Sequence, residues 1–187
     1  MFIFVLMRKE KSMSLDELRN DIIIKQKKGL PFILTSVVIW LLITVVAALD
    51  INIAMKNILV FCCSMPMLPL SWLIGKKIGV DIFSKDNELG NLGFLFTMNQ
   101  ILYLLIVIWV FNSVPDKMIM VYAMVFGAHL LPYSWLYKSK AYRVFAIIIP
   151  VLSLVLGNLF GGFVVAGTAA AVEIAFVFIL RNELNGI

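Results

Sequence analysis

This chain is poor in the residues that most enzymes use for chemistry. It has one histidine, two cysteines and only 14% charged residues in a length of 187. The cysteines, Cys62 and Cys63, are neighbours, which gives poor geometry for a disulfide between them and no metal-ligand spacing. A single histidine beside such a pair does not make a usual zinc site. We therefore expect no metal ion and no disulfide, and we assign both cysteines to helix packing or lipid contact.

Sequence motifs of the common catalytic classes are missing as well. The chain has no H-E-x-x-H, no G-x-S-x-G and no G-x-x-x-x-G-K-[ST] motif. Pairing Ser64 or Ser134 with His129 as nucleophile and base would rest on no recognisable spacing. The sequence therefore predicts a protein that is not an enzyme and that uses no cofactor.

Apolar sequence, by contrast, is abundant. Hydrophobic residues make up 62% of the chain and the mean hydropathy is +1.00, more apolar side chain than a soluble domain of this length could bury. A helix needs roughly 20 apolar residues to cross the hydrocarbon core of a bilayer. The sequence therefore predicts an all-α integral membrane protein, a polytopic bundle of six transmembrane helices. We place the spans at residues 32–49, 53–74, 92–111, 118–137, 143–157 and 162–180.

The basic residues are distributed unequally between the two sides of these spans. If the N-terminus is cytoplasmic, 14 of the 16 Lys and Arg residues lie on the inner side, and only Lys56 and Lys117 lie outside. Basic residues near helix ends resist translocation, so this division predicts a cell-membrane protein with both termini cytoplasmic. The net charge of +5 then follows from orientation, and no basic soluble domain is present to bind nucleic acid. The inner residues are Arg8, Lys9, Lys11, Arg19, Lys25, Lys27, Lys28, Lys76, Lys77, Lys85, Lys138, Lys140, Arg143 and Arg181.

The N-terminal region divides into two parts before the six-span domain of residues 31–187. Residues 1–12 are expected to be a disordered extension or to precede the true start at Met13, and they lack the charge order of a signal peptide. Ser14 and Glu17 have capping-box spacing, so residues 13–30 are predicted to contain an amphipathic helix on the inner leaflet. The alternative is that this helix packs on the inner loops.

One short motif occurs twice. Leu68–Leu73 reads L-P-L-S-W-L and Leu131–Leu136 reads L-P-Y-S-W-L, 63 residues later. The second and fourth spans therefore resemble each other in the same direction, a parallel repeat; the alternative is that tryptophan anchors and proline kinks recur independently. Kinks are predicted at the prolines inside spans, namely Pro66, Pro69, Pro132 and Pro150.

Six polar residues near the middle of three spans are the candidate binding residues for a solute or ion. An ionisable group near the bilayer centre is costly and usually faces the bundle interior. By counting at about 1.5 Å per residue, Glu173, His129, Asn99 and Gln100 fall at similar depths. Tyr103 follows Asn99 by four residues and Tyr133 follows His129 by four, so each pair shares a helix face. We expect one buried polar cluster if these helices meet.

The cluster has two interpretations. A carboxyl and an imidazole together suit proton movement or cation binding, with desolvation disfavouring the charged form of Glu173 unless protonated His129 pairs with it. Alternatively, Glu173 only hydrogen-bonds to a neighbouring helix and holds the bundle together. Small residues at four-residue spacings from Gly157 onward would draw the sixth span into the bundle or form a dimer face.

The outer side of the protein offers little material for a site. Its joints are short, so we expect any function to lie within the bilayer or at the inner face. Lys56 and Asn57 are expected to be solvated at the outer end of the second span. The alternative is an inward-facing Lys56, which would attract anions.

The stretch Met13–Asn20, the following K-K-G-L-P-F-I and the later H-L-L-P-Y-S-W-L-Y-K-S-K-A-Y resemble an uncharacterised family of small multi-pass membrane proteins of Gram-positive bacteria. The resemblance covers nearly the whole chain from Met13. It implies a bacterial cell membrane and transfers no functional residue, because that family has no assigned activity.

Three functional hypotheses follow, all with the lipid bilayer as a partner. The first is a small transport or permeation protein, oligomeric in form, with a midplane site for a proton, cation or small polar solute. The second is a non-catalytic assembly, stress or immunity module whose buried polar residues only hold helices together. The third is a lipid-directed enzyme that uses His129.

Overall fold

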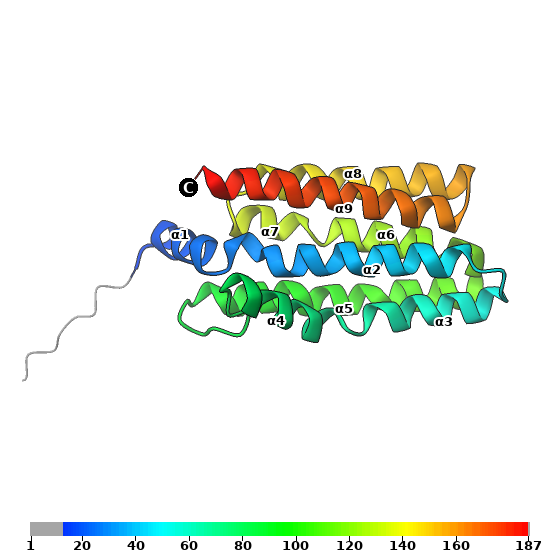
Figure 1. The fold of residues 1–187 in the computed structure, drawn as a ribbon, viewed down its shortest axis with the longest axis horizontal. Helices are drawn as coiled ribbons and strands as arrows, with labels where there is room; N and C mark the ends of the chain where they lie inside the picture. Colours follow the sequence, from blue (N-terminus) through cyan, green and yellow to red (C-terminus); the bar gives the residue numbers. More distant parts are fainter. Residues whose placement is uncertain (1–12, 187) are drawn as a thin grey trace, which may run out of the picture.

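A computed structural model describes residues 13–186 as a bundle of helices that run along one long axis (Figure 1). The predicted extension, residues 1–12, lies outside the described residues. No β-strand occurs between residues 13 and 186. The elements are α1 (Leu15–Lys25), the 3₁₀ turn η1 (Lys27–Gly29), α2 (Leu30–Ala48), α3 (Ile53–Ser64), α4 (Met67–Ile78), α5 (Leu89–Ser113), the 3₁₀ turn η2 (Pro115–Lys117), α6 (Met118–Ala128), α7 (Leu131–Leu136), α8 (Lys140–Leu159) and α9 (Gly162–Asn185).

Six helical segments are long and apolar enough to cross a membrane, which confirms the predicted fold class. Each overlaps one predicted span, and the fifth is longer than expected because α8 already begins at Lys140. The described chain starts and finishes at the same end of the bundle, here termed the α1 end (Figure 1). The opposite end is termed the far end. The six segments are Lys27–Ala48, Ile53–Ile78, Leu89–Ser113, Pro115–Leu136, Lys140–Leu159 and Gly162–Asn185.

The second and fourth spans are each broken near the middle. The break between α3 and α4 falls at Met65 and Pro66, and helix resumes when the Leu70 N–H donates to the Pro66 carbonyl at 2.9 Å. The break between α6 and α7 falls at His129 and Leu130, just before Pro132. Proline lacks an N–H donor and clashes with the preceding turn, which explains both interruptions. Pro150, by contrast, lies inside the unbroken α8.

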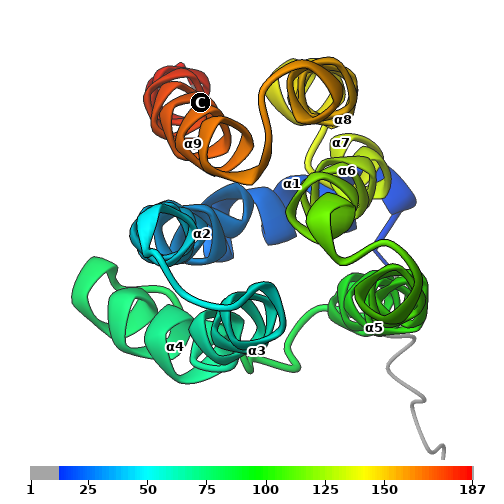
Figure 2. The same cartoon turned by 90° about the vertical axis from the view of Figure 1, so that its right-hand side faces the viewer.

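The six spans form three layers of two, seen end-on in Figure 2. α8 and α9 make one layer, α2 and the α6–α7 span make the middle one, and α3–α4 and α5 make the third. α2 packs closely on α9, and α6 packs closely on α8. The Trp40 ring of α2 reaches across the middle layer to Tyr122 and Phe126 of α6, with ring centroids 5.7 and 5.5 Å apart. The core therefore lies in the first two layers.

The small residues of α9 face into the bundle. Val165, Ala166, Ala169 and Ala170 are buried, so α9 approaches α2 and α8 closely. This outcome matches the first of the two predicted roles of the small-residue stretch, packing within one chain.

α5 is the most peripheral span. Of its 25 residues only Val107 and Val110 are buried, and large apolar side chains are exposed along its length. Such exposure is expected of a surface that meets lipid tails. Cys62 is exposed and Cys63 packs partly against the core, and both are free thiols as expected.

Helix α1 has the predicted capping box and packs on neighbouring loops. The Ser14 side chain accepts a hydrogen bond from the Glu17 backbone, and the Glu17 side chain accepts one from the Ser14 N–H. Ile22 and Ile23 are buried, and Asn87 of the α4–α5 loop donates to the Asp21 carboxylate at 2.7 Å. Helix α1 therefore contacts loops at the α1 end, and its position on the inner leaflet stays a prediction.

An ion pair and a hydrogen bond connect the junction between α1 and α2, and the turn before α8, to the last turn of α9. Lys27, Lys28 and Gly29 all have positive φ angles, of 45°, 51° and 69°. This turn directs the Lys28 Nζ onto the Glu183 carboxylate at 2.8 Å, and Ser139 donates to the same carboxylate oxygen at 2.6 Å. Lys28, Ser139 and Glu183 thus connect the α1–α2 junction and the turn before α8 to the last turn of α9.

Candidate functional site

Glu173 lies in the middle of α9 and is enclosed by protein. Its side chain is 0% exposed. The Ser36 hydroxyl of α2 donates to Oε2, while Oε1 has no hydrogen-bond partner among residues 13–186. The carboxyl group therefore faces the bundle interior, as the sequence predicted, and one of its oxygens has no hydrogen-bond partner among the described residues.

A second contact between buried hydroxyl groups joins α2 to α4, and it is separate from the contact of Ser36 with Glu173, because the Thr35 hydroxyl donates to the Pro31 carbonyl at 2.8 Å. Thr35 precedes Ser36 on α2, and Ser71 of α4 donates to the Thr35 hydroxyl at 3.0 Å. Thr35, Ser36 and Ser71 are all buried. Our sequence reasoning missed these three residues, although two signals pointed to them: adjacent hydroxyls inside an apolar span, and the serine of the repeated L-P-x-S-W-L motif.

His129 sits at the break between α6 and α7 and is half-buried. Its Nδ1 contacts the carbonyl of Phe126, one turn earlier on the same span. The imidazole ring packs edge-on against Tyr133, with centroids 6.0 Å apart. Within the described part of the chain His129 forms neither an ion pair nor a hydrogen bond with Glu173. Its ring nitrogen contacts the Phe126 carbonyl and forms no hydrogen bond with the hydroxyl of Ser64 or Ser134 among the described residues.

Tyr133 joins α7 to the first half of α5. Its hydroxyl shares a hydrogen bond with Thr97 at 2.8 Å and donates to the Gly93 carbonyl at 3.1 Å. Asn99 and Gln100 are half-buried one turn further along α5, and Tyr103 is 39% exposed. Between residues 13 and 186 no side-chain hydrogen bond is formed by these last three residues.

The six candidate residues are therefore divided between two places. Glu173 lies between α9 and α2, whereas His129, Tyr133 and the α5 residues lie on the α5 and α6–α7 side. The physical reason is the layer order: α5 and α9 occupy opposite corners of the bundle, with the middle layer between them (Figure 2). Similar depth along the helices, which the sequence predicted, does not by itself bring side chains into contact. The expected single cluster does not form among the described residues.

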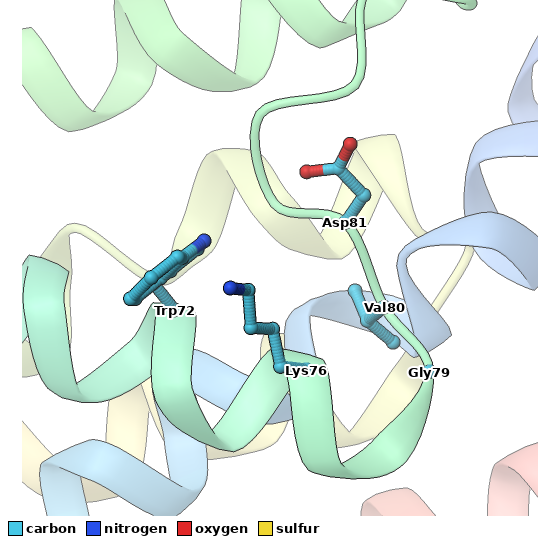
Figure 3. A pocket seen from close by; sticks show the side chains of 5 residues that line it. All are labelled: Trp72, Lys76, Gly79, Val80 and Asp81. Atoms are coloured by element: carbon cyan, nitrogen blue, oxygen red, sulfur yellow. The ribbon is translucent and has the colours of Figure 1, made fainter.

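A hollow of about 430 Å³ lies at the α1 end. Trp72, Lys76, Gly79, Val80 and Asp81 line it, at the end of α4 and in the loop that follows (Figure 3). The Lys76 Nζ lies 3.7 Å from the centre of the Trp72 ring, a cation–π contact. The guanidinium carbon of Arg19 lies 4.6 Å from the centre of the Trp135 ring, a second cation–π contact. Each tryptophan thus has a cationic neighbour, an arrangement typical of side chains at a membrane interface.

No group of three or more His, Cys, Asp or Glu residues between residues 13 and 186 is placed to hold a metal ion. The chemistry that the buried residues offer is hydrogen bonding and proton exchange at one carboxyl group. Glu173 with Ser36, Thr35 and Ser71 is therefore the candidate site, and we name it the Glu173 site.

Comparison with known proteins identifies a family but no relative of known activity. Neither the curated proteins nor the solved structures give a match to this chain. The match to a family covers residues 15–183, which include helix α1, the first five spans and all but the last two residues of α9. The chain belongs to the family of unknown function DUF7010.

Proposed function

We propose that this protein moves a proton, cation or small polar solute across a membrane, with Glu173 as the residue that binds it. The observation that carries the proposal is a fully enclosed carboxyl group with one oxygen that no described residue satisfies. A buried ionisable group in a membrane span is expensive to maintain, and such groups commonly lie on ion pathways.

The two broken spans support the same proposal. Both breaks lie well inside their spans, away from the span ends. Discontinuous helices expose backbone N–H and carbonyl groups at mid-membrane depth, where many transporters bind their substrates. Ser71, which donates to the Thr35 hydroxyl of α2, lies on α4 shortly after the first break.

The arrangement is that of a closed state. Glu173 has no exposed surface, so a solute or water molecule reaches it only when α2 and α9 separate or when α4 moves away from α2. Transport in this mechanism requires a helix movement, and the broken α3–α4 span is the natural place for one because its hydrogen-bond ladder is already interrupted.

We place the protein in a bacterial cell membrane, with both termini in the cytoplasm. Both described ends lie at the α1 end, as two termini on one side of a membrane require (Figure 1). The excess of Lys and Arg in the joints on that side supports its assignment to the cytoplasm. Self-association of the chain belongs to the same proposal, since α5 leaves a long apolar surface free of intramolecular packing. The proposal includes no catalytic activity.

The test is a flux assay on purified protein reconstituted into liposomes that enclose a pH-sensitive dye. After an acid pulse, wild-type protein should acidify the lumen faster than empty liposomes, and Glu173→Gln should reduce this to the empty-liposome rate. Gln keeps the shape and hydrogen-bonding ability of Glu but does not titrate. Glu88→Gln is the matched control, because Glu88 is exposed in the loop before α5. Equal flux in wild type and Glu173→Gln would contradict proton movement through this site.

A non-catalytic assembly module is the second candidate function. It is favoured by the hydrogen bond from Ser36 to Glu173, which joins the closely packed α2 and α9. Under this hypothesis Glu173→Gln behaves like wild type in every assay, whereas Glu173→Leu removes the hydrogen bond and prevents assembly. Size-exclusion profiles of the two variants in detergent distinguish the two functions.

A further inference from the structure

A second, smaller pocket of about 190 Å³ opens at the far end of the bundle. It lies where the end of α2, the start of α3, the turn η2 with the start of α6, and the start of α9 come together. Three kinds of surface meet in it: charged side chains, a buried amide and apolar side chains. The lining residues are Ala47, Ile53, Lys56, Asn57, Pro115, Asp116, Ile119, Gly161, Gly162 and Phe163.

Asn57 presents an unused hydrogen-bond acceptor to this pocket. Its side chain is 0% exposed, and its Nδ2 donates to the Pro115 carbonyl at 2.9 Å, which fixes the orientation of the amide. No residue between 13 and 186 donates to Oδ1, the other amide atom. Buried polar atoms are nearly always paired, so an N–H or O–H group from outside the chain is the missing partner. The expectation that Asn57 is solvated was therefore wrong, because the turn η2 covers it.

Positive charge lines another part of the pocket. α9 has 24 residues, and its N-cap, Gly161, supplies no side-chain hydrogen bond to the first turn. Gly161 has φ 110° and ψ 179°, a conformation open essentially only to glycine. The first N–H groups of a helix have no partner within it, and together with the helix dipole they attract anions. Lys56 adds an ammonium group, of which one donor is used on the Ala47 carbonyl at 3.1 Å.

The remaining lining completes the description of the ligand. Asp116 offers a carboxylate for a donor group, and Ile53, Ile119 and Phe163 offer apolar contacts for a short carbon chain. The volume limits the occupant to a few heavy atoms. We propose that this pocket binds a small carboxylic acid with an adjacent N–H or O–H donor, an α-amino or α-hydroxy acid. Its carboxylate faces the α9 N-terminus and Lys56, and its donor faces Asn57 and Asp116.

This site does not depend on the transport proposal. It lies at the far end of the spans, whereas the Glu173 site lies at mid-depth between α2 and α9. Binding at equilibrium is measurable whether or not the protein transports anything, so the two proposals fail separately.

The binding test uses the full chain in lipid nanodiscs and four small probes in competition with radiolabelled L-alanine. L-alanine and L-lactate carry both recognised groups, propionate lacks the donor, and ethylamine lacks the carboxylate. Saturable binding of L-alanine or L-lactate, with propionate and ethylamine at least roughly tenfold weaker, supports the proposal. The ratio between L-alanine and L-lactate identifies the donor. Absence of saturable binding, or propionate binding as tight as that of L-alanine and L-lactate, overturns the proposal; water alone would then fill the pocket.

Substitutions locate the binding to this pocket. Lys56→Met removes the ammonium group, and Asn57→Ser removes the free acceptor with a small loss of volume. Each should weaken L-alanine binding by roughly tenfold or more, the factor expected for loss of one good polar contact. Lys117→Met and Asn158→Ser are the matched controls, because both residues lie at the far end but outside the pocket lining. Equal weakening by the controls, or no weakening by Lys56→Met, overturns the assignment.

Discussion

At Glu173 the two oxygens of one carboxyl group have different surroundings. Oε2 accepts a hydrogen bond from Ser36, and Oε1 has no partner in the part of the chain that the structure describes. A group used only to hold helices together gains most when both oxygens are satisfied. The half-satisfied state is instead what a binding residue needs, because it leaves one oxygen for the ligand.

Ser36→Ala tests the energetic importance of the one contact that Glu173 makes. The substitution leaves the enclosed carboxyl group without a described partner, so we expect the free energy of unfolding to fall by about 1–3 kcal/mol. Reversible denaturation in mixed micelles, followed by circular dichroism, measures it. Ser153→Ala is the comparison, since Ser153 is also buried on a span, α8, but at a distance from any carboxylate. Equal losses in both variants would show that the Glu173 contact has no special weight.

At the scale of elements, hydrogen bonds of two aspartate side chains of α1 attach this helix to loops at the α1 end. A hydrogen bond from Asn87 lowers the pKa of Asp21, with a smaller contribution from Lys25 and partial opposition from burial. Hydrogen bonding to Lys138 lowers the pKa of Asp16 in the same direction. Asp16 and Asp21 belong to α1, Asn87 to the α4–α5 loop and Lys138 to the turn before α8. These contacts therefore dock α1 on two separate loops.

The docking of α1 should weaken in acid. A carboxyl group whose pKa is lower in the folded state than in the unfolded one stabilises the fold above its unfolded value, about pH 4 for Asp. This contribution is lost as the pH falls through the lowered folded-state pKa. Hydrogen exchange of the α1 amides, corrected for the intrinsic rate, should therefore accelerate below about pH 4 relative to the amides of α2.

Asp21→Asn is the control for this acid effect. Asparagine still accepts the hydrogen bond from Asn87 but does not titrate, so the variant should lose much of the pH dependence and keep α1 helical. Acid exchange in Asp21→Asn as steep as in wild type would assign the effect to other groups.

At the scale of the whole molecule, the sequence predicted the six spans because these depend on local properties. Of the four prolines at which it predicted kinks, two lie at helix breaks, whereas Pro69 and Pro150 lie inside the unbroken α4 and α8. Runs of about 20 apolar residues fix where spans lie, and Pro66 and Pro132 fix where two of them break. The neighbours of each span depend on packing between helices that are all apolar, and hydropathy carries no information on it. For this reason the sequence could predict a buried Glu173 but not the separation of Asn99, His129 and Glu173 between layers.

The proposed orientation has a direct consequence for fusion proteins. Alkaline phosphatase, which is active only outside the cytoplasm, should be inactive when fused at the C-terminus and active when fused in the η2 turn near Asp116. Green fluorescent protein should give the opposite pattern. We base this expectation on the basic residues gathered at the α1 end. Active phosphatase at the C-terminus would reverse the orientation and place the far-end pocket in the cytoplasm.

The most direct measurement of the central claim is infrared difference spectroscopy on the protein in lipid, with the pH of the medium cycled. The account predicts a carboxyl difference band that is reversible with pH, shifts in D₂O and is missing in Glu173→Gln. Such a band shows that the enclosed carboxyl group exchanges protons with water during helix movement. A spectrum in which wild type and Glu173→Gln do not differ would contradict the account, because Glu173 would then be sealed from water and would serve only to join α2 and α9.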